Sequence, residues 1–98
     1  MYSNNWNEIK ATNHAYERLK ERKGFKGDKK HADDYVKKAF RHGVHLMDLE
    51  PEEKSKIKLR IKHNTPEGFR VGKVTVYQRS VFIFTKDNKC LTVLKYEN

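Results

Sequence analysis

Cysteine is nearly absent from this 98-residue chain, since Cys90 is the only one. A single thiol excludes an internal disulfide, and no set of cysteines and histidines has the spacing of a zinc site. We therefore expect a reducing, cytosolic setting and no bound metal. Cys90 lies in an apolar stretch, where a small buried strand residue is the expected role.

Long hydrophobic runs are absent as well. The densest apolar run, Val81–Phe84, is far too short to cross a bilayer, and the first residues lack the apolar core of a signal peptide. The sequence therefore predicts a soluble protein that binds no membrane. Residues 1–98 are expected to form a single domain, because so short a chain cannot fill a second core. Trp6 is expected to pack an N-terminal arm onto that domain, the alternative being that it stacks on a base.

Acidic side chains are few compared with basic ones. There are 13 Asp and Glu against 22 Lys and Arg, so the formal net charge is +9 and the sequence pI is about 9.7. This balance disfavours an acidic mimic of nucleic acid, and it favours a polyanion or an acidic protein surface as partner. Although the mean hydropathy is −1.02, the five Tyr, five Phe and one Trp provide enough apolar surface for a small core.

Two helices are predicted in the first half of the chain. Thr12 is suited to cap the first helix, which ends at Gly24. Asp28 is suited to cap the second, over residues 29–42, whose apolar positions recur at i, i+3, i+4, i+7 and i+8. That spacing forms one apolar stripe, which is typical of a helix that covers a core.

The second half is predicted to form strands. Residues 56–62 alternate strictly between basic and apolar side chains, and a period of two is typical of a strand. In a helix, Leu59 would lie off the face shared by Ile57 and Ile61. Residues 64–68 are then expected to form a hairpin loop. Three further strands are predicted over residues 69–77, 81–85 and 90–96.

Some local features complete this α+β prediction. Pro51 is placed to begin a short helical turn, and Gly72 is a candidate bulge. The predicted order is ααββββ, with two N-terminal helices packed on a four-stranded antiparallel sheet. The helical part is expected over residues 12–43 and the sheet part over residues 56–96.

The sharpest chemical pattern lies on the first helix, where His14, Arg18 and Arg22 recur at i, i+4 and i+8 and so share one face. Metal-independent RNA cleavage needs a base for the 2′-hydroxyl, cations for the phosphate and an acid for the leaving oxygen. Histidine titrates near neutral pH, and arginine binds phosphate with a charged fork. The stripe thus predicts His14 as general base or acid, with both arginines on the scissile phosphate. The structural alternatives are that His14 hydrogen-bonds a loop or strand and that Arg18 pairs with Glu17 or Glu21.

This stretch also carries a resemblance. From Thr12 to Gly24 the chain reads Thr-x-His-Ala-x-x-Arg-x-x-x-Arg-x-Gly, and a second helix ending in glycine and a tyrosine-containing β-meander follow. The arrangement resembles small prokaryotic and phage-borne domains of the barnase–EndoU–colicin–RelE-type ribonuclease toxin fold, over residues 12–43 and 77–96, about half the chain. The resemblance implies an RNA substrate, and it implicates the following residues: His14, Arg18, Arg22, Tyr77, Thr92 and Tyr96.

A second basic feature is the predicted strand itself. Four cations would project from one of its faces, namely Lys56, Lys58, Arg60 and Lys62. Such a row could follow a phosphate backbone without reading its sequence. Together with Arg79 in the turn at residues 78–80, these are the predicted nucleic-acid-binding residues. The alternative is a solvated edge strand whose lysines prevent aggregation.

Two functions are compatible with these features. The first is a small toxin-type endoribonuclease or RNA-binding protein, acting without metal or cofactor, in which Tyr77 or Tyr96 is an auxiliary proton donor. Both tyrosines have the alternative role of half-buried strand residues. The second is a non-catalytic, phage-encoded inhibitor that docks on a host nucleoprotein or defence complex through its basic face. The expected partners are therefore RNA, a nucleoprotein complex, an acidic protein or an antitoxin.

Overall fold

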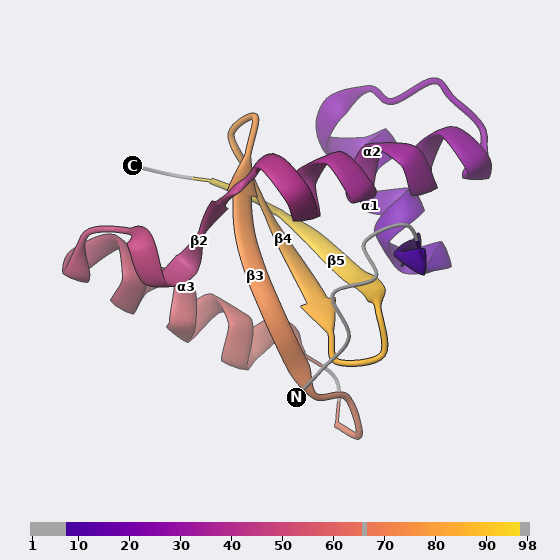
Figure 1. Ribbon diagram of the computed structural model, residues 1–98. Coiled ribbons are helices and arrows are strands. Elements are labelled where there is room, and N and C mark those ends of the chain that lie inside the picture. The colour runs from indigo at the N-terminus through magenta and orange to yellow at the C-terminus, as the bar shows by residue number, and fades with distance from the viewer. Residues whose placement is uncertain (1–7, 66, 97–98) are drawn as a thin grey trace.

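The computed structural model describes residues 8–65 and 67–96, in which three α-helices surround a five-stranded sheet (Figure 1). The strand order is β1-β5-β4-β3-β2. β1 (Lys10–Ala11) pairs with β5 (Lys89–Lys95) in parallel, and the other neighbours are antiparallel. The α+β prediction is confirmed. The prediction of four antiparallel strands is wrong, because the sheet is mixed and its outer strands, β1 and β2 (Val44–His45), are too short to leave a sequence pattern.

The first two helices begin where the sequence predicts. α1 (Asn13–Lys23) follows Thr12, whose hydroxyl accepts a backbone N–H bond of 3.1 Å, and it ends at Gly24 in the left-handed region, with φ 61°. α2 (Lys29–His42) follows Asp28, whose carboxylate accepts a backbone N–H bond of 3.0 Å. These side chains satisfy backbone donors that a helix start leaves unpaired.

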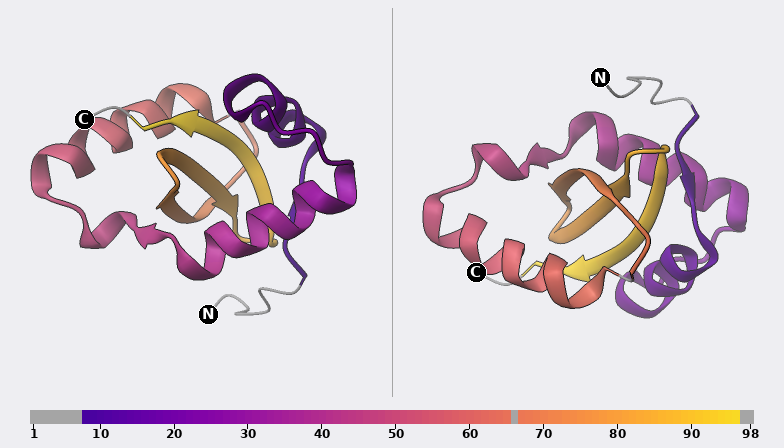
Figure 2. Two further views of the ribbon diagram at one scale, coloured as in Figure 1. Left: turned by 90° about the horizontal axis from the view of Figure 1, so that it is seen from above. Right: turned by 90° about the horizontal axis from the view of Figure 1, so that it is seen from below.

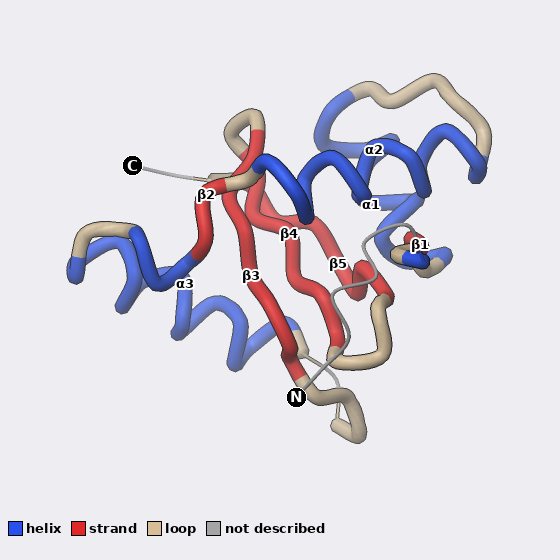
Figure 3. Tube along the Cα trace, in the orientation of Figure 1, coloured by secondary structure: helices blue, strands red, loops and turns tan. Residues whose placement is uncertain are grey.

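Residues 56–62 belong to a helix and not to a strand (Figure 3). α3 (Pro51–Asn64) has Pro51 at its start and acidic residues in its first turn, and its lysines, leucine and arginine are good helix formers. Ile57 is buried, with 3 % of its surface exposed, whereas Leu59 is 59 % exposed. The predicted strand, and the hairpin loop that depended on it, are therefore wrong. The short helical turn expected at Pro51 extends over 14 residues.

The sheet has a hydrophobic core on each side (Figure 2), where α2 and α3 lie on opposite sides of the strands. All six residues of β4 (Ser80–Thr85) are buried between β3 (Val71–Tyr77) and β5, as expected of a central strand. The core shared with α1 and α2 includes Leu19, Val36, Phe82 and Phe84. The core beneath α3 includes Leu46 from the 3₁₀ turn η2 (Leu46–Asp48), Ile57, Ile83 and Leu94.

Several local predictions are confirmed. The pairing of β3 with β4 shifts register across Gly72, which is the predicted bulge, and a Cβ on Gly72 would lie 3.0 Å from the backbone of Lys86. Cys90 is fully buried in β5, and burial raises the pKa of its thiol, so it has no reactive character. The prediction for Trp6 lies outside the described residues. None of the helices in the described part of the chain has the length and apolarity needed to cross a membrane.

Candidate functional site

One end of the sheet gathers cations from three separate parts of the chain. Arg22 and Lys23 lie on the last turn of α1, Arg79 lies in the β3–β4 turn, and Lys95 ends β5. We call these four residues the basic end. They line a hollow of about 450 Å³, together with Glu21, Gln78 and Ser80. Because like charges repel, their convergence creates a positive potential that an anion would relieve.

A second hollow adjoins the first. It has a volume of about 500 Å³ and is lined by Val76, Arg79, Lys95 and Tyr96, so the two hollows share Arg79 and Lys95. These two cations therefore face both hollows, and they are the centre of the basic end. An extended anion with several charges could occupy both hollows at once.

The turn that carries Arg79 has an unusual backbone. Gln78 and Arg79 have φ values of 46° and 63°, the signs of the type I′ turn that suits a two-residue hairpin. Such turns favour asparagine and glycine, because a side chain in the left-handed region costs about 1–2 kcal/mol. Strained residues of this kind are concentrated at functional sites, so the turn is a candidate for function on conformational grounds alone.

Both N-terminal helices hold this turn in place. The ammonium group of Lys23 donates a hydrogen bond to the carbonyl oxygen of Gln78, and the Tyr35 hydroxyl donates to the Gln78 side chain at 2.7 Å. Burial, followed by the nearby charge of Arg79, lowers the pKa of Lys23, and burial raises the pKa of Tyr35. Hydrogen bonds from α1 and α2 thus hold the β3–β4 turn of the basic end in place, although the cations there repel one another.

The third helix is attached to the same end. The Tyr96 hydroxyl donates a hydrogen bond of 2.6 Å to Glu53 of α3, and this bond raises the pKa of Tyr96. The guanidinium of Arg60 donates to the carbonyl oxygen of Lys95. The predicted basic row has four cations. Among the described residues, Arg60 is the one of these four that is hydrogen-bonded to the basic end.

The predicted row itself is divided. Successive helical residues are rotated by about 100°, so Lys56 and Arg60 lie on one side of α3, and Lys58 and Lys62 lie on another. The idea that four cations form one line on a strand is wrong for this reason. The prediction that these residues bind nucleic acid does not depend on the strand, and it stays a prediction.

The predicted stripe on α1 forms, but its histidine lies away from the basic end. His14 is exposed in the first turn of α1, and Arg22 lies eight residues later, about 12 Å along the axis. Arg18 pairs with Glu21 at 3.4 Å, which is the structural alternative stated for it. Among the described residues that line the two hollows of the basic end, none is a histidine.

Two further residues named by the resemblance are packed inside the fold. Tyr77 is half-buried, and its ring lies 5.9 Å from the ring of Tyr35 and 6.4 Å from that of Phe82. Thr92 is buried within β5. Tyr77 therefore corresponds to the structural alternative stated for it, that of a half-buried strand residue. Of the predicted site residues, Arg22, Arg79 and Tyr96 are the ones that line the hollows described above.

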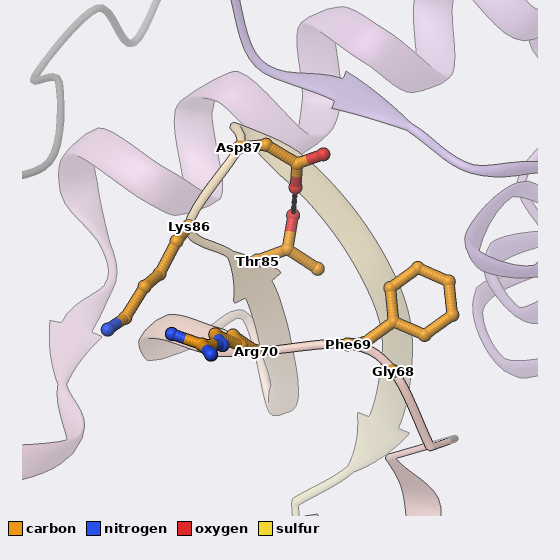
Figure 4. Close-up of a pocket in the computed structure, with 6 residues that line it drawn as sticks. All are labelled: Gly68, Phe69, Arg70, Thr85, Lys86 and Asp87. Atoms are coloured by element: carbon orange, nitrogen blue, oxygen red, sulfur yellow. Dashed lines mark hydrogen bonds between the residues drawn. The ribbon is translucent and has the colours of Figure 1, made fainter.

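The opposite end of the sheet carries a smaller hollow of about 270 Å³ around the segment that precedes β3 (Figure 4). Arg70 and Lys86 extend toward the same side of it, and the ring of Phe69 points away from them. The Thr85 hydroxyl donates to the carboxylate of Asp87, which lowers the pKa of Asp87. None of these residues belongs to a recognisable sequence motif, so the spacing of residues does not predict this hollow.

Phe69 also lines a separate pocket beside α1. This pocket, which we call the Phe69 pocket, has a volume of about 310 Å³ and is lined by Thr12, His14, Asn64, Phe69 and Leu91. It joins the start of α1, the end of α3 and the N-terminal half of β5. His14 therefore belongs to this pocket and not to the basic end.

No three His, Cys, Asp or Glu side chains in residues 8–65 and 67–96 are grouped so that they could hold a metal ion. Comparison with family models, with curated proteins and with solved structures finds no match to this chain. The basic end and the Phe69 pocket are therefore the features of the described chain that bear on its function.

Proposed function

We propose that this protein binds RNA in the cytosol through its basic end, which holds the phosphate backbone. The observation that carries the proposal is the convergence of Arg22, Lys23, Arg79 and Lys95 on two adjoining hollows. Arginine and lysine at such a site bind phosphate oxygens by charge-assisted hydrogen bonds. The choice of RNA follows from the resemblance of the α1 pattern to ribonuclease toxin domains.

The backbone of the β3–β4 turn supports the same reading. An arginine in the left-handed region is costly for stability, whereas a cation at the tip of a hairpin is well placed to reach a phosphate. Burial lowers the pKa of Lys23, and the nearby charge of Arg79 adds a smaller repulsion. A bound phosphate would reduce that repulsion, and binding would then stabilise the protein.

Cleavage of the bound RNA is a second candidate activity, favoured by the position of Tyr96. Its phenol lines the same hollow as Arg79 and Lys95, and its hydroxyl donates a hydrogen bond of 2.6 Å to the carboxylate of Glu53. Such a group could protonate a leaving oxygen beside the bound phosphate. Binding by the basic end does not depend on this step.

The proposal is tested by fluorescence anisotropy with a short labelled single-stranded RNA. Arg79→Glu should weaken binding by about tenfold or more, and it should reduce the slope of log K against log salt by about one or more, because a phosphate contact is lost. Lys30→Glu is the matched control. It makes the same change of charge at an exposed position on the first turn of α2, which lines neither hollow of the basic end, and it should alter the affinity by less than about twofold.

Equal losses for the two variants would mean that net charge, and not the basic end, determines binding. Failure of the wild-type protein to bind RNA at all would overturn the proposal and leave a protein partner, such as an acidic surface or a nucleoprotein complex. A denaturing gel of the recovered RNA separates the two activities. Intact RNA identifies a binding protein, and fragments that disappear with Tyr96→Phe identify a ribonuclease.

A further inference from the structure

The Phe69 pocket lies where three elements meet, at the opposite end of α1 from the basic end. Phe69 is 47 % exposed, and it belongs to neither hydrophobic core. Leu91 is buried and provides an apolar wall. The pocket therefore presents an aromatic face to solvent. This ring is not part of either hydrophobic core of the described chain.

Two polar side chains beside the ring have unused hydrogen-bonding groups. Asn64 donates one hydrogen bond of 2.8 Å to the backbone of Arg60 through its amide nitrogen, and its amide oxygen has no partner among the described residues. The His14 ring also makes no hydrogen bond within the described chain. By contrast, the Thr12 hydroxyl is occupied by β5 and by the start of α1. The free groups are a carboxamide and an imidazole, which can bond the edge of a planar heterocycle.

The volume of the pocket also limits its ligand. At about 310 Å³, it lies at the lower limit of the range of about 300–1,000 Å³ that holds small organic ligands. An aromatic face with adjacent donors and acceptors is the usual way in which proteins bind an unstacked base. One nucleobase fits these features, whereas a base inside a duplex is stacked on both faces and cannot enter.

The pocket and the basic end are connected by α1. Arg22 lies about 12 Å along the helix axis from His14, and a stacked strand advances about 3.4 Å per nucleotide. Three to four nucleotides would therefore join the two sites. On the other side of Phe69, Arg70 and Lys86 extend in one direction (Figure 4), where they could contact a further phosphate.

We propose that the Phe69 pocket takes one unpaired base of the RNA strand whose backbone is held by the basic end, so that the protein selects single-stranded over duplex RNA. This inference rests on the proposed function, and it adds the substrate class. The ring of Phe69 stacks on the base, and His14 and Asn64 bond its edge. The basic end supplies affinity without selecting the form of the strand.

The test compares single-stranded and duplex RNA of the same length by fluorescence anisotropy. Wild-type protein should prefer the single strand by about tenfold or more, since stacking on one aromatic ring contributes this much to binding. Phe69→Ala should remove most of that preference by weakening single-strand binding, and it should leave duplex binding unchanged. Met47→Ala is the matched control, because Met47 is also an exposed apolar side chain, at 59 %, but lies outside the pocket; it should change neither affinity.

A change in the RNA keeps the test independent of protein folding. A strand with an abasic nucleotide at the bound position should bind the wild-type protein more weakly, and the same abasic change should have little further effect in Phe69→Ala. Additive losses, or a Phe69→Ala variant with normal single-strand preference, would overturn the inference. If Arg79→Glu still weakens binding by about tenfold or more in that case, the proposed RNA binding stands without the base pocket. If neither form of RNA binds the wild-type protein, both proposals fail.

Discussion

At the scale of single residues, the two hairpin turns of the sheet differ in a way that concerns function. The β4–β5 turn places Asn88 in the left-handed region, with φ 66°, and asparagine tolerates this conformation well. The β3–β4 turn places Arg79 there, with φ 63°, where an arginine is strained. The same chain therefore uses a suitable residue in one turn and a costly cation in the other.

This contrast predicts opposite effects on stability and on binding. Arg79→Gly should raise the free energy of unfolding by about 1 kcal/mol, because glycine adopts the left-handed region without strain, and it should weaken RNA binding by removing the cation. Urea denaturation and anisotropy measure the two effects. Asn88→Gly is the control, with a smaller gain in stability and unchanged RNA affinity. A less stable Arg79→Gly protein would show that the arginine itself supports the fold.

At the scale of elements, α3 shows how one pattern can fit two structures. Seven alternating residues place three apolar side chains on one face of a strand, but a helix buries Ile57 and half-buries Ile61 while it exposes Leu59. The signals that distinguish the two structures lie upstream, in Pro51 and the acidic first turn. The caps of α1 and α2 and the three long strands could be predicted, because each has a local signal of adequate length.

The site could be predicted only in part for a related reason. Local basic patterns predict Arg22 and Arg79, and the resemblance implicates Tyr96; all three line the hollows at one end of the sheet. Lys95 and Glu53 were missed, because their positions depend on the register of β5 beside the β3–β4 turn and on the helical conformation of α3. Pairings between distant segments leave no trace in the spacing of residues.

Two alanine substitutions distinguish the helix from the strand. Ile57→Ala should lower the free energy of unfolding by about 2–4 kcal/mol, the usual cost of emptying a buried isoleucine site. Leu59→Ala, two residues away, should change it by less than about 0.5 kcal/mol, because its side chain is largely exposed. Thermal and urea denaturation provide the measurement. Similar losses for both variants would contradict the helix and restore the alternating strand.

At the scale of the whole molecule, burial is distributed unevenly around the sheet. β4 is buried along its whole length, and β5 is buried except at its ends. Of the described side chains of α3, Ile57 is the one that is buried. Regions with few buried contacts open at lower free energy than the core strands, so the molecule should be most rigid at its centre and least rigid along α3.

Hydrogen exchange followed by mass spectrometry measures this distribution. Backbone amides of β4 and β5 should exchange most slowly, at rates close to those of global unfolding, and amides of α3 should exchange faster through local opening. Addition of RNA should slow exchange at the β3–β4 turn most, since that turn carries Arg79. Uniform protection of α3 and β4 would contradict the prediction and would mean that the third helix opens only when the whole molecule unfolds.

The outer strands of the sheet have a consequence for many copies on one polymer. β1 and β2 contain two residues each and cover only part of β5 and β3. The rest of the β3 edge carries the bulge at Gly72 and the cation Lys73, both of which hinder pairing with the sheet of a neighbouring molecule, and α1 packs along β5. A basic protein is concentrated by a polyanion to local levels far above those in solution. Sheet edges of this kind would allow copies crowded along one RNA to remain separate. The complex would then return to single molecules when the RNA is removed.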